Sequence, residues 1–171
     1  MSLPKSQGPI AAWMQKRHLK GVTSIEEANH AWEGWGEKEF VKRLRDKNTI
    51  GLVSTISDVV GAFAIYELCE KEILILKFEV AKELLSTRAG HVLLNALKKK
   101  GAKYKKNVVG VFPEHREDIK KYEFFAKEGF SSALKRKFSS ETEQEVRDNY
   151  VFTWKYSDFE DLGTDEDSDR V

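Results

Sequence analysis

The pattern of apolar and polar residues over positions 72–100 predicts a strand followed closely by a helix. The strand is an almost unbroken apolar run, made of Ile73, Leu74, Ile75, Leu76, Phe78 and Val80. The helix repeats apolar residues at helical spacing, at Ala89, Val92, Leu93, Ala96 and Leu97. Because an unbroken apolar run is typical of a strand covered on both faces, we expect this strand at the centre of a sheet. A strand that leads into a helix through a short loop presents free backbone N–H groups where a phosphate could bind.

Before this segment, the pattern predicts a first strand over residues 10–17 and then two short helices. Thr23 and Ser24 each begin a capping-box pattern, so the first helix is expected to begin there and to end near Trp32. The second helix is expected over residues 37–46, with its apolar side chains on one side.

Strand-forming residues return after the second helix. Residues 50–56 and 59–68 are rich in β-branched and aromatic side chains, and the two residues between them, Ser57 and Asp58, are expected to form a hairpin turn. Because short connections cannot make parallel crossovers, these strands and the central strand should form an antiparallel meander.

The central helix is expected to end at Gly101, and residues 107–112 then form another short apolar strand. A helix separates this strand from the central one, which implies a parallel crossover. A further helix is expected from residue 114 to the helix-ending Gly129, and closing strands are expected over residues 130–138 and 149–156. The prediction is an α+β fold with a mixed central sheet of six to seven strands and helices on both faces.

The bulk composition narrows the class of protein. At 171 residues the chain is long enough for one domain with its own core, which we expect over residues 1–156. With 40% hydrophobic and 33% charged residues it is expected to be soluble, and no apolar run is long enough to span a membrane. The first ten residues lack the pattern of a secretory signal, and the single cysteine, Cys69, cannot form an internal disulfide. We therefore expect a cytoplasmic protein.

Charge is distributed unevenly along the chain. Residues 157–171 form an acidic tail, expected to be disordered because it has too few apolar side chains to offset the entropy of ordering. The tail carries one arginine, Arg170, and seven acids: Asp158, Glu160, Asp161, Asp165, Glu166, Asp167 and Asp169. Its net charge is therefore −6, and since the whole chain carries +1, residues 1–156 carry +7. Lysines gather over residues 98–106, where they form either a solvated helix end or a site that binds phosphate groups, those of RNA among them.

Seven short motifs follow one another along the chain: Ile10-x-x-Trp13-Met14, Trp35-x-x-x-x-Phe40, Val60-Gly61-x-x-x-x-Tyr66-Glu67-Leu68, Phe78-x-Val80, Gly90-x-x-Leu93-Leu94-x-x-Leu97, Phe124-Phe125-x-x-x-Gly129-Phe130 and Tyr150-Val151-x-x-x-x-Tyr156. Taken in their order and spacing, these motifs resemble the GNAT acyltransferase superfamily and its ribosomal-protein alanine N-acetyltransferase branch. The resemblance covers residues 10–156 and implies the GNAT fold.

The resemblance implies acetyl-CoA as the cofactor. In the family, a splayed strand offers its backbone to the pantetheine arm, and the loop before the next helix wraps the pyrophosphate. The corresponding positions in this chain are Phe78, Val80, Arg88, Ala89, Gly90, His91, Asp118 and Phe125. Leu85 and Arg88 replace residues that are Gln or Arg and Gly in the family loop. Arg88 is therefore either a phosphate ligand or a solvated first-turn residue, and His91 fits a polar surface position better than a catalytic one.

Other residue types occupy the acid–base positions of the family. The position of the general-base glutamate is Pro113, so Glu114 and Glu117 are the nearest candidates, although Glu114, together with His115, also fits an exposed cap before the helix. The position of the general-acid tyrosine is Phe125, which has no proton to donate, and Tyr122 lies one turn away. Glu114, Glu117 and Tyr122 are therefore the candidate catalytic residues. No group of His, Cys and carboxylate side chains has metal-ligand spacing in the sequence, so no metal site is predicted.

Two functions are compatible with this resemblance. The first is an acetyl-CoA-dependent N-acetyltransferase that acts on an amine, with a protein N-terminus as one candidate acceptor. Such an enzyme can rely on orientation and on a backbone N–H that polarises the thioester carbonyl. The second is a catalytically degenerate GNAT-fold module that binds a protein or RNA partner. Trp32 and Trp35 either line an acceptor cleft or pack in the core. The sequence favours a protein or peptide acceptor over nucleic acid, and a monomer or homodimer.

Overall fold

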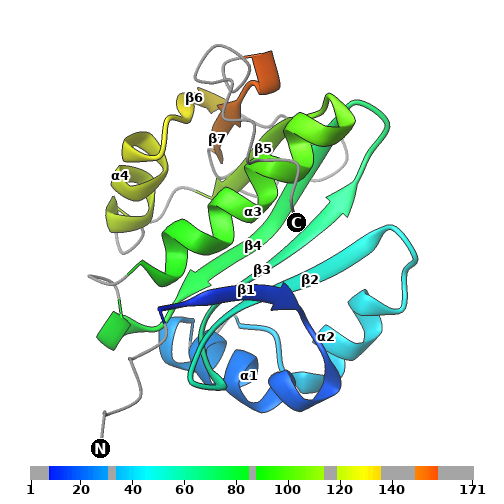
Figure 1. Ribbon diagram of the computed structural model, residues 1–171, viewed down its shortest axis with the longest axis vertical. Helices are drawn as coiled ribbons and strands as arrows, with labels where there is room; N and C mark the ends of the chain where they lie inside the picture. The colour runs from blue at the N-terminus through cyan, green and yellow to red at the C-terminus, as the bar shows by residue number, and fades with distance from the viewer. Residues whose placement is uncertain (1–7, 31–33, 85–87, 114–118, 136–148, 158–171) are drawn as a thin grey trace, which may run out of the picture. The chain divides into compact units, whose positions relative to one another are not determined.

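The computed structural model describes residues 8–30, 34–84, 88–113, 119–135 and 149–157 (Figure 1). Its main elements are, in chain order, β1 (Ile10–Trp13), α1 (Leu19–Asn29), α2 (Glu37–Leu44), β2 (Thr49–Ile56), β3 (Val59–Leu68), β4 (Glu72–Val80), α3 (Ala89–Tyr104), β5 (Asn107–Pro113), α4 (Ile119–Lys127), β6 (Ser131–Lys135) and β7 (Asn149–Trp154). Short 3-10 helices cover Lys16–His18 and Lys82–Leu84. The strands of the described chain form a seven-stranded sheet in the order β1-β2-β3-β4-β5-β7-β6. This order confirms the α+β prediction and the middle position of β4.

The described chain forms two units. The first contains β1, α1, α2, β2 and β3 with residues 74–80 of β4 and residues 89–97 of α3. The second contains the end of α3 with β5, α4, β6 and β7. The single domain over residues 1–156 with a tail over residues 157–171 stays a prediction, and residues 158–171 lie outside the described residues.

An antiparallel hairpin organises the first unit. β2 pairs with β3 so that Val53 faces Phe63, and β1 pairs with the other edge of β2. Ser57 and Asp58 connect β2 to β3 with φ values of 50° and 65°. Two successive residues with positive φ are the signature of the tight turn that matches the twist of a hairpin, so the predicted turn is confirmed.

The core of the first unit lies where α1 and α2 pack against β2 and β3. Its buried members are Leu19, Val22, Ile25, Phe40, Val53, Phe63 and Ile65. Phe40 joins the two layers, because its ring meets the ring of Phe63 edge-on at 5.6 Å and the ring of Trp35 at 5.3 Å. The predicted second helix therefore has its apolar side in the core, as expected from its spacing.

The start of α1 was wrongly predicted. The helix begins at Leu19, so Thr23 and Ser24 lie inside it instead of capping it. Their hydroxyls donate to the carbonyls one turn earlier, at 2.7 Å to Leu19 O and 2.9 Å to Lys20 O. A hydroxyl that donates to the carbonyl four residues earlier lies inside a helix, so the capping-box pattern at Thr23 and Ser24 does not mark the start of α1. The first strand is likewise shorter than predicted and ends at Trp13.

The end of α3, in the second unit, also differs from the prediction. The helix runs through Gly101 to Tyr104, and Lys105 with φ of 54° ends it. The N–H of Lys106 donates to Gly101 O at 2.8 Å, so Gly101 lies three positions before the last residue of the helix and is not the residue that stops it. A Cβ at Gly101 would lie 2.7 Å from Lys106 O, which explains why this position lacks a side chain.

α4 ends as the sequence predicted. Gly129 has φ of 90°, and the N–H of Phe130 donates to Phe125 O at 3.0 Å. The rings of Phe125 and Phe130 meet edge-on at 5.1 Å, which is the apolar contact that accompanies this helix ending. β7 lies between β5 and β6 and pairs antiparallel with both.

Among the helices of the described residues, none is long and apolar enough to cross a membrane.

Candidate functional site

β4 carries two of the predicted cofactor-binding residues in the first unit. Phe78 is 1% exposed, and Val80 is half-buried at the end of the strand. The backbone around Val80 is held on both sides: Asn29 Nδ2 donates to Val80 O at 3.2 Å, and the N–H of the next residue, Ala81, donates to Gly61 O at 2.9 Å. This end of β4 is therefore fixed by α1 and by β3.

The start of α3 carries the predicted phosphate-binding residues. Ala89 and Gly90 are buried, Arg88 is exposed and His91 is half-buried. A Cβ on Gly61 of β3 would lie 2.9 Å from Leu84 Cδ1 and 3.5 Å from Ala89 Cβ, so the missing side chain lets this part of the chain lie close to β3. Leu85 lies outside the described residues.

The predicted residues of α4 belong to the second unit. Phe125 is fully buried, and its ring lies 5.4 Å from Phe112 and 5.3 Å from Phe152. Tyr122 is half-buried, with its ring 4.7 Å from Tyr150 and 5.6 Å from Phe152. Glu114, Glu117 and Asp118 lie outside the described residues, so their roles stay predictions.

A buried polar cluster lies between α1 and β4, and none of its residues was among the predicted site residues. His30 Nε2 and Glu79 Oε1 lie 2.5 Å apart, and Asn29 Nδ2 donates to Glu79 Oε2 at 3.0 Å. Lys77 Nζ donates to Glu26 Oε1 at 2.9 Å. Glu26 is 0% exposed and Glu79 is 5% exposed. These five residues are called the α1–β4 cluster below.

The helix and strand periods explain how this cluster forms. Glu26 and Asn29 are three positions apart and so share one side of α1, and His30 is the residue that directly follows this helix. Lys77 and Glu79 are two positions apart in β4 and are the charged residues that interrupt its apolar run after Glu72. Charged residues in an otherwise apolar strand therefore indicated a buried polar cluster. The partners of these residues could not be identified, because they lie about fifty positions away along the chain.

The charges of the α1–β4 cluster are balanced in pairs. Two buried carboxylates would be costly without compensation, and Lys77 compensates Glu26 while His30 can compensate Glu79. Donor atoms of Glu26, His30 and Glu79 lie within 4.8 Å of one another, a spacing that a metal ion could use. Because the ammonium of Lys77 already neutralises Glu26, we assign no metal ion to this cluster.

Trp35 lies beside the α1–β4 cluster and is half-buried. Lys77 Nζ lies 4.7 Å from the centre of its ring, and Arg43 Cζ lies 5.2 Å from it. Its other contacts are to the core of the first unit, so Trp35 combines core packing with a cation-binding face. Trp32 lies outside the described residues.

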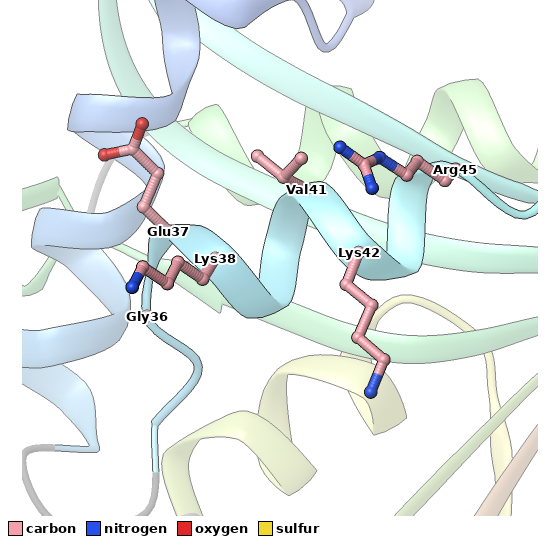
Figure 2. A pocket seen from close by; sticks show the side chains of 6 residues that line it. All are labelled: Gly36, Glu37, Lys38, Val41, Lys42 and Arg45. Atoms are coloured by element: carbon pink, nitrogen blue, oxygen red, sulfur yellow. The ribbon is translucent and has the colours of Figure 1, made fainter.

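A surface hollow of about 660 Å³ follows α2 (Figure 2). Its lining residues in the described chain are Gly36, Glu37, Lys38, Val41, Lys42 and Arg45. Figure 2 shows Lys42 pointing away from Arg45, so these cations do not converge on one point. The hollow is basic, but its side chains do not form a built site for one anion.

The lysines at the end of α3 are not uniformly solvated. Lys98 lies 3.5 Å from Glu128 Oε2 and also donates to the Glu128 carbonyl. Burial lowers the pKa of Lys100, and the nearby charge of Lys103 lowers it further. These contacts favour a packed helix end over a free row of cations.

The fold matches that of solved acetyltransferases. The ribosomal-protein-S18-alanine N-acetyltransferase from Escherichia coli aligns over 86% of this chain and 94% of its own, with 18% identity and a TM-score of 0.69. Ard1 from Thermoplasma volcanium aligns over 87% of this chain and 98% of its own, with 16% identity and a TM-score of 0.70. An aminoglycoside 6′-N-acetyltransferase complexed with coenzyme A aligns over 86% of this chain and 97% of its own, with 11% identity and a TM-score of 0.68. The chain therefore has the GNAT fold.

No protein-family model and no curated protein sequence matches the chain. At identities of 11–18%, the similarity establishes the fold and leaves the reaction to be argued from the residues.

Proposed function

We propose that this protein is an acetyl-CoA-dependent N-acetyltransferase that acts on an amine, with a protein N-terminus as the first acceptor to test. The observation that carries the proposal is the match of 86% of the chain to solved acetyltransferases, one of them complexed with coenzyme A. The end of β4, where Asn29 and Gly61 hold the backbone, and the buried start of α3 support it, because these are the segments that the resemblance assigns to the cofactor.

Thermal unfolding with and without acetyl-CoA tests the cofactor part of the proposal. A ligand that binds only the folded chain adds about 2.7 kcal/mol of stability at a hundred times its dissociation constant, so the unfolding temperature should rise. Arg88→Glu should weaken acetyl-CoA binding if Arg88 is a phosphate ligand, while Arg45→Glu, the same charge reversal on α2, should not. An unchanged unfolding temperature at millimolar acetyl-CoA would end the proposal.

Transfer is then measured as the release of the free thiol of CoA. Peptides with a free N-terminus are compared with the same peptides acetylated in advance, and polyamines provide acceptors of another class. We expect release with at least one free amine and none with the blocked peptides.

The alternative is a GNAT-fold module that binds a protein or RNA partner without catalysis. It is favoured by the burial of Phe125 at the family's tyrosine position and by Pro113 at the position of the glutamate. Binding of acetyl-CoA without thiol release from any acceptor would support this alternative. RNA binding requires an affinity that falls steeply with salt, and its absence at low salt would exclude RNA as the partner.

A further inference from the structure

The surface hollow along α2 begins beside the strand that the proposed function assigns to the cofactor. Gly36 lines the hollow, and the ring of the preceding residue, Trp35, lies 4.7 Å from Lys77 Nζ of β4. Lys77 precedes Val80 by three positions, which is about 10 Å along a strand. These residues all belong to the first unit. An acceptor whose amine reaches the end of β4 could therefore extend past Trp35 onto α2.

The cations of this hollow are available to a partner. Lys38, Lys42 and Arg45 are exposed, and no carboxylate in the described part of the chain pairs with any of the three. The neighbouring Arg43 does not line the hollow, and its Nε lies 2.9 Å from Glu39 Oε1. The hollow therefore carries positive charge that the described residues do not neutralise.

The spacing of these cations suits an extended acidic segment better than a single anion. Lys38 and Lys42 are about 6 Å apart along the helix axis, and Arg45 follows after about 4.5 Å. Side chains on one side of an extended peptide are about 7 Å apart, which is a similar interval. Glu37 also lines the hollow, but Figure 2 shows its side chain pointing away from that of Lys42. Three cations and one acid leave these lining residues with a net charge of +2.

The chemistry of the hollow favours a peptide over a nucleic acid. Sites for single-stranded nucleic acids combine cations with aromatic side chains on which the bases stack. Among the described residues that line the hollow, the uncharged side chain is the aliphatic Val41, and none is aromatic. The nearby ring of Trp35 is half-buried and already has Lys77 and Arg43 as its cationic neighbours.

We infer that α2 binds an acidic segment of the acceptor, so that the preferred acceptor is a protein or peptide with acidic residues a few positions after its reacting N-terminus. This inference rests on the proposed function and names the class of its substrate. The interval of about 10 Å between the end of β4 and Lys77 corresponds to about three residues of extended peptide, so the acids should begin at about the fourth residue. Contacts so far from the reacting amine are the same in the ground state and the transition state, and they lower KM without changing kcat.

The inference is tested with the full chain by measuring thiol release from three peptides with a free N-terminus. The peptides are identical except for a run of five residues that starts at the fourth position and consists of glutamate, serine or arginine. Arginine supplies positive charge without a second amine that could be acetylated. The glutamate peptide should have a kcat/KM about 3- to 10-fold above that of the serine peptide, through a lower KM, because exposed ion pairs are individually weak. The difference should shrink in about 0.5 M salt.

Variants of α2 show whether this preference comes from the hollow. Lys38→Gln/Lys42→Gln should remove the preference, and Lys38→Glu/Lys42→Glu should make the arginine peptide the better acceptor. Lys20→Glu/Lys127→Glu makes the same change of net charge at two exposed lysines that do not line the hollow, and it should keep the preference. Thermal unfolding in acetyl-CoA shows whether each variant keeps its fold and its cofactor site, and the glutamine variant decides if the glutamate variant does not fold.

The outcomes separate this inference from the proposed function. Equal kcat/KM for the three peptides, or a preference that persists in the α2 variants, would overturn the inference and leave the proposed function intact, as would release from polyamines alone. Equal peptide rates together with an RNA affinity that falls in Lys38→Glu/Lys42→Glu would assign α2 to nucleic acid and overturn the inference as well. Cofactor binding by the wild-type protein without thiol release from any amine would overturn both.

Discussion

His18 is a buried histidine that the fold keeps neutral. Its Nδ1 accepts a hydrogen bond from the backbone N–H of Gln15 at 2.9 Å, which requires an unprotonated nitrogen. Burial lowers the pKa of His18, the charge of Arg17 lowers it further, and Asp58 opposes both effects. The neutral imidazole of His18 thus satisfies the backbone N–H of Gln15 at the start of the short 3-10 helix that precedes α1.

We expect the free energy of unfolding to fall as the pH drops below about 6.5, the ordinary pKa of histidine. A lowered pKa in the folded state means that the unfolded chain binds the proton more readily. The stability contributed by His18 is therefore fully present above about pH 6.5 and is lost as the pH falls through the lower, folded pKa. His18→Asn keeps an acceptor without a titrating group, so its stability should depend less on pH.

Urea unfolding of both proteins between about pH 7 and about pH 5 checks this expectation. Because other groups also titrate in this range, the quantity to compare is the difference between the two curves. A constant difference across the range would contradict a role for His18.

The candidate site shows at the residue scale what a sequence can and cannot predict. The places of Phe78 and Val80 in β4 and of Gly90 in α3 could be predicted from the apolar run and the helical period, while their role at a cofactor stays a prediction. His30 and Glu79 could not be paired, because neither belongs to a local motif and their contact joins residues 49 positions apart. The observation that Lys77 and Glu79 interrupt an apolar run was the available signal, since buried charges need partners.

At the scale of elements, the ends of α3 and α4 use the same backbone arrangement with different residues. Lys105 has φ of 54° where Gly129 has φ of 90°. In each case the N–H of the following residue donates to a carbonyl five positions earlier, at Gly101 and at Phe125. The left-handed conformation is costly for lysine and free for glycine.

Lys105→Gly should therefore raise the free energy of unfolding by about 0.5–1 kcal/mol, and Gly129→Ala should lower it by about 1–2 kcal/mol. Nothing lies within 4 Å of a Cβ built on Gly129, so the second effect is conformational and not steric. Lys103→Gly is the matched control, because the same change inside α3 should destabilise the helix. Urea unfolding measures all three; the same sign for both lysine variants would rule out this explanation.

Elements could be predicted where local chemistry decides the conformation. The hairpin at Ser57 and Asp58 and the helix end at Gly129 follow from turn residues between clear periods. The predictions were wrong where the same local sequence pattern is compatible with two different structures. Thr23 and Ser24 match a capping box but bond back along α1, and Gly101 matches a helix stop but allows α3 to pass close to Lys106 O.

At the scale of the whole molecule, the charge distribution of the sequence has a measurable consequence. Removing residues 158–171 deletes a net charge of −6 and changes the chain from +1 to +7. The shortened chain should bind polyanions more tightly, with a steeper dependence on salt, because more counterions are released on binding.

Elution from heparin in a salt gradient compares the full chain with the chain ending at residue 157. A chain whose acidic residues after position 157 are replaced by serine is the control for length, and it should elute with the shortened chain. Equal elution of all three would show that the acids have no effect on polyanion binding.

The order of the strands in the second unit could not be predicted from the sequence. The closing strands were located, but nothing in the periods of residues 130–156 indicates that β7 lies between β5 and β6. This insertion depends on pairing across the sheet: Phe152 pairs with Gly110 of β5 and with Ser132 of β6. Pairs of this kind depend on long-range contacts, which local propensity does not encode.

Because β7 lies between β5 and β6, the sheet cannot be completed during synthesis until β7 has been made. Until residues 149–154 leave the ribosome, the strand edges of β5 and β6 that will face β7 have no partner, although both strands have already been made. Unpaired edges are the surfaces on which chains associate wrongly, and incomplete chains are exposed to such association. A product of premature termination before position 149 should therefore engage chaperones and proteases far more than one that has lost only the residues after β7.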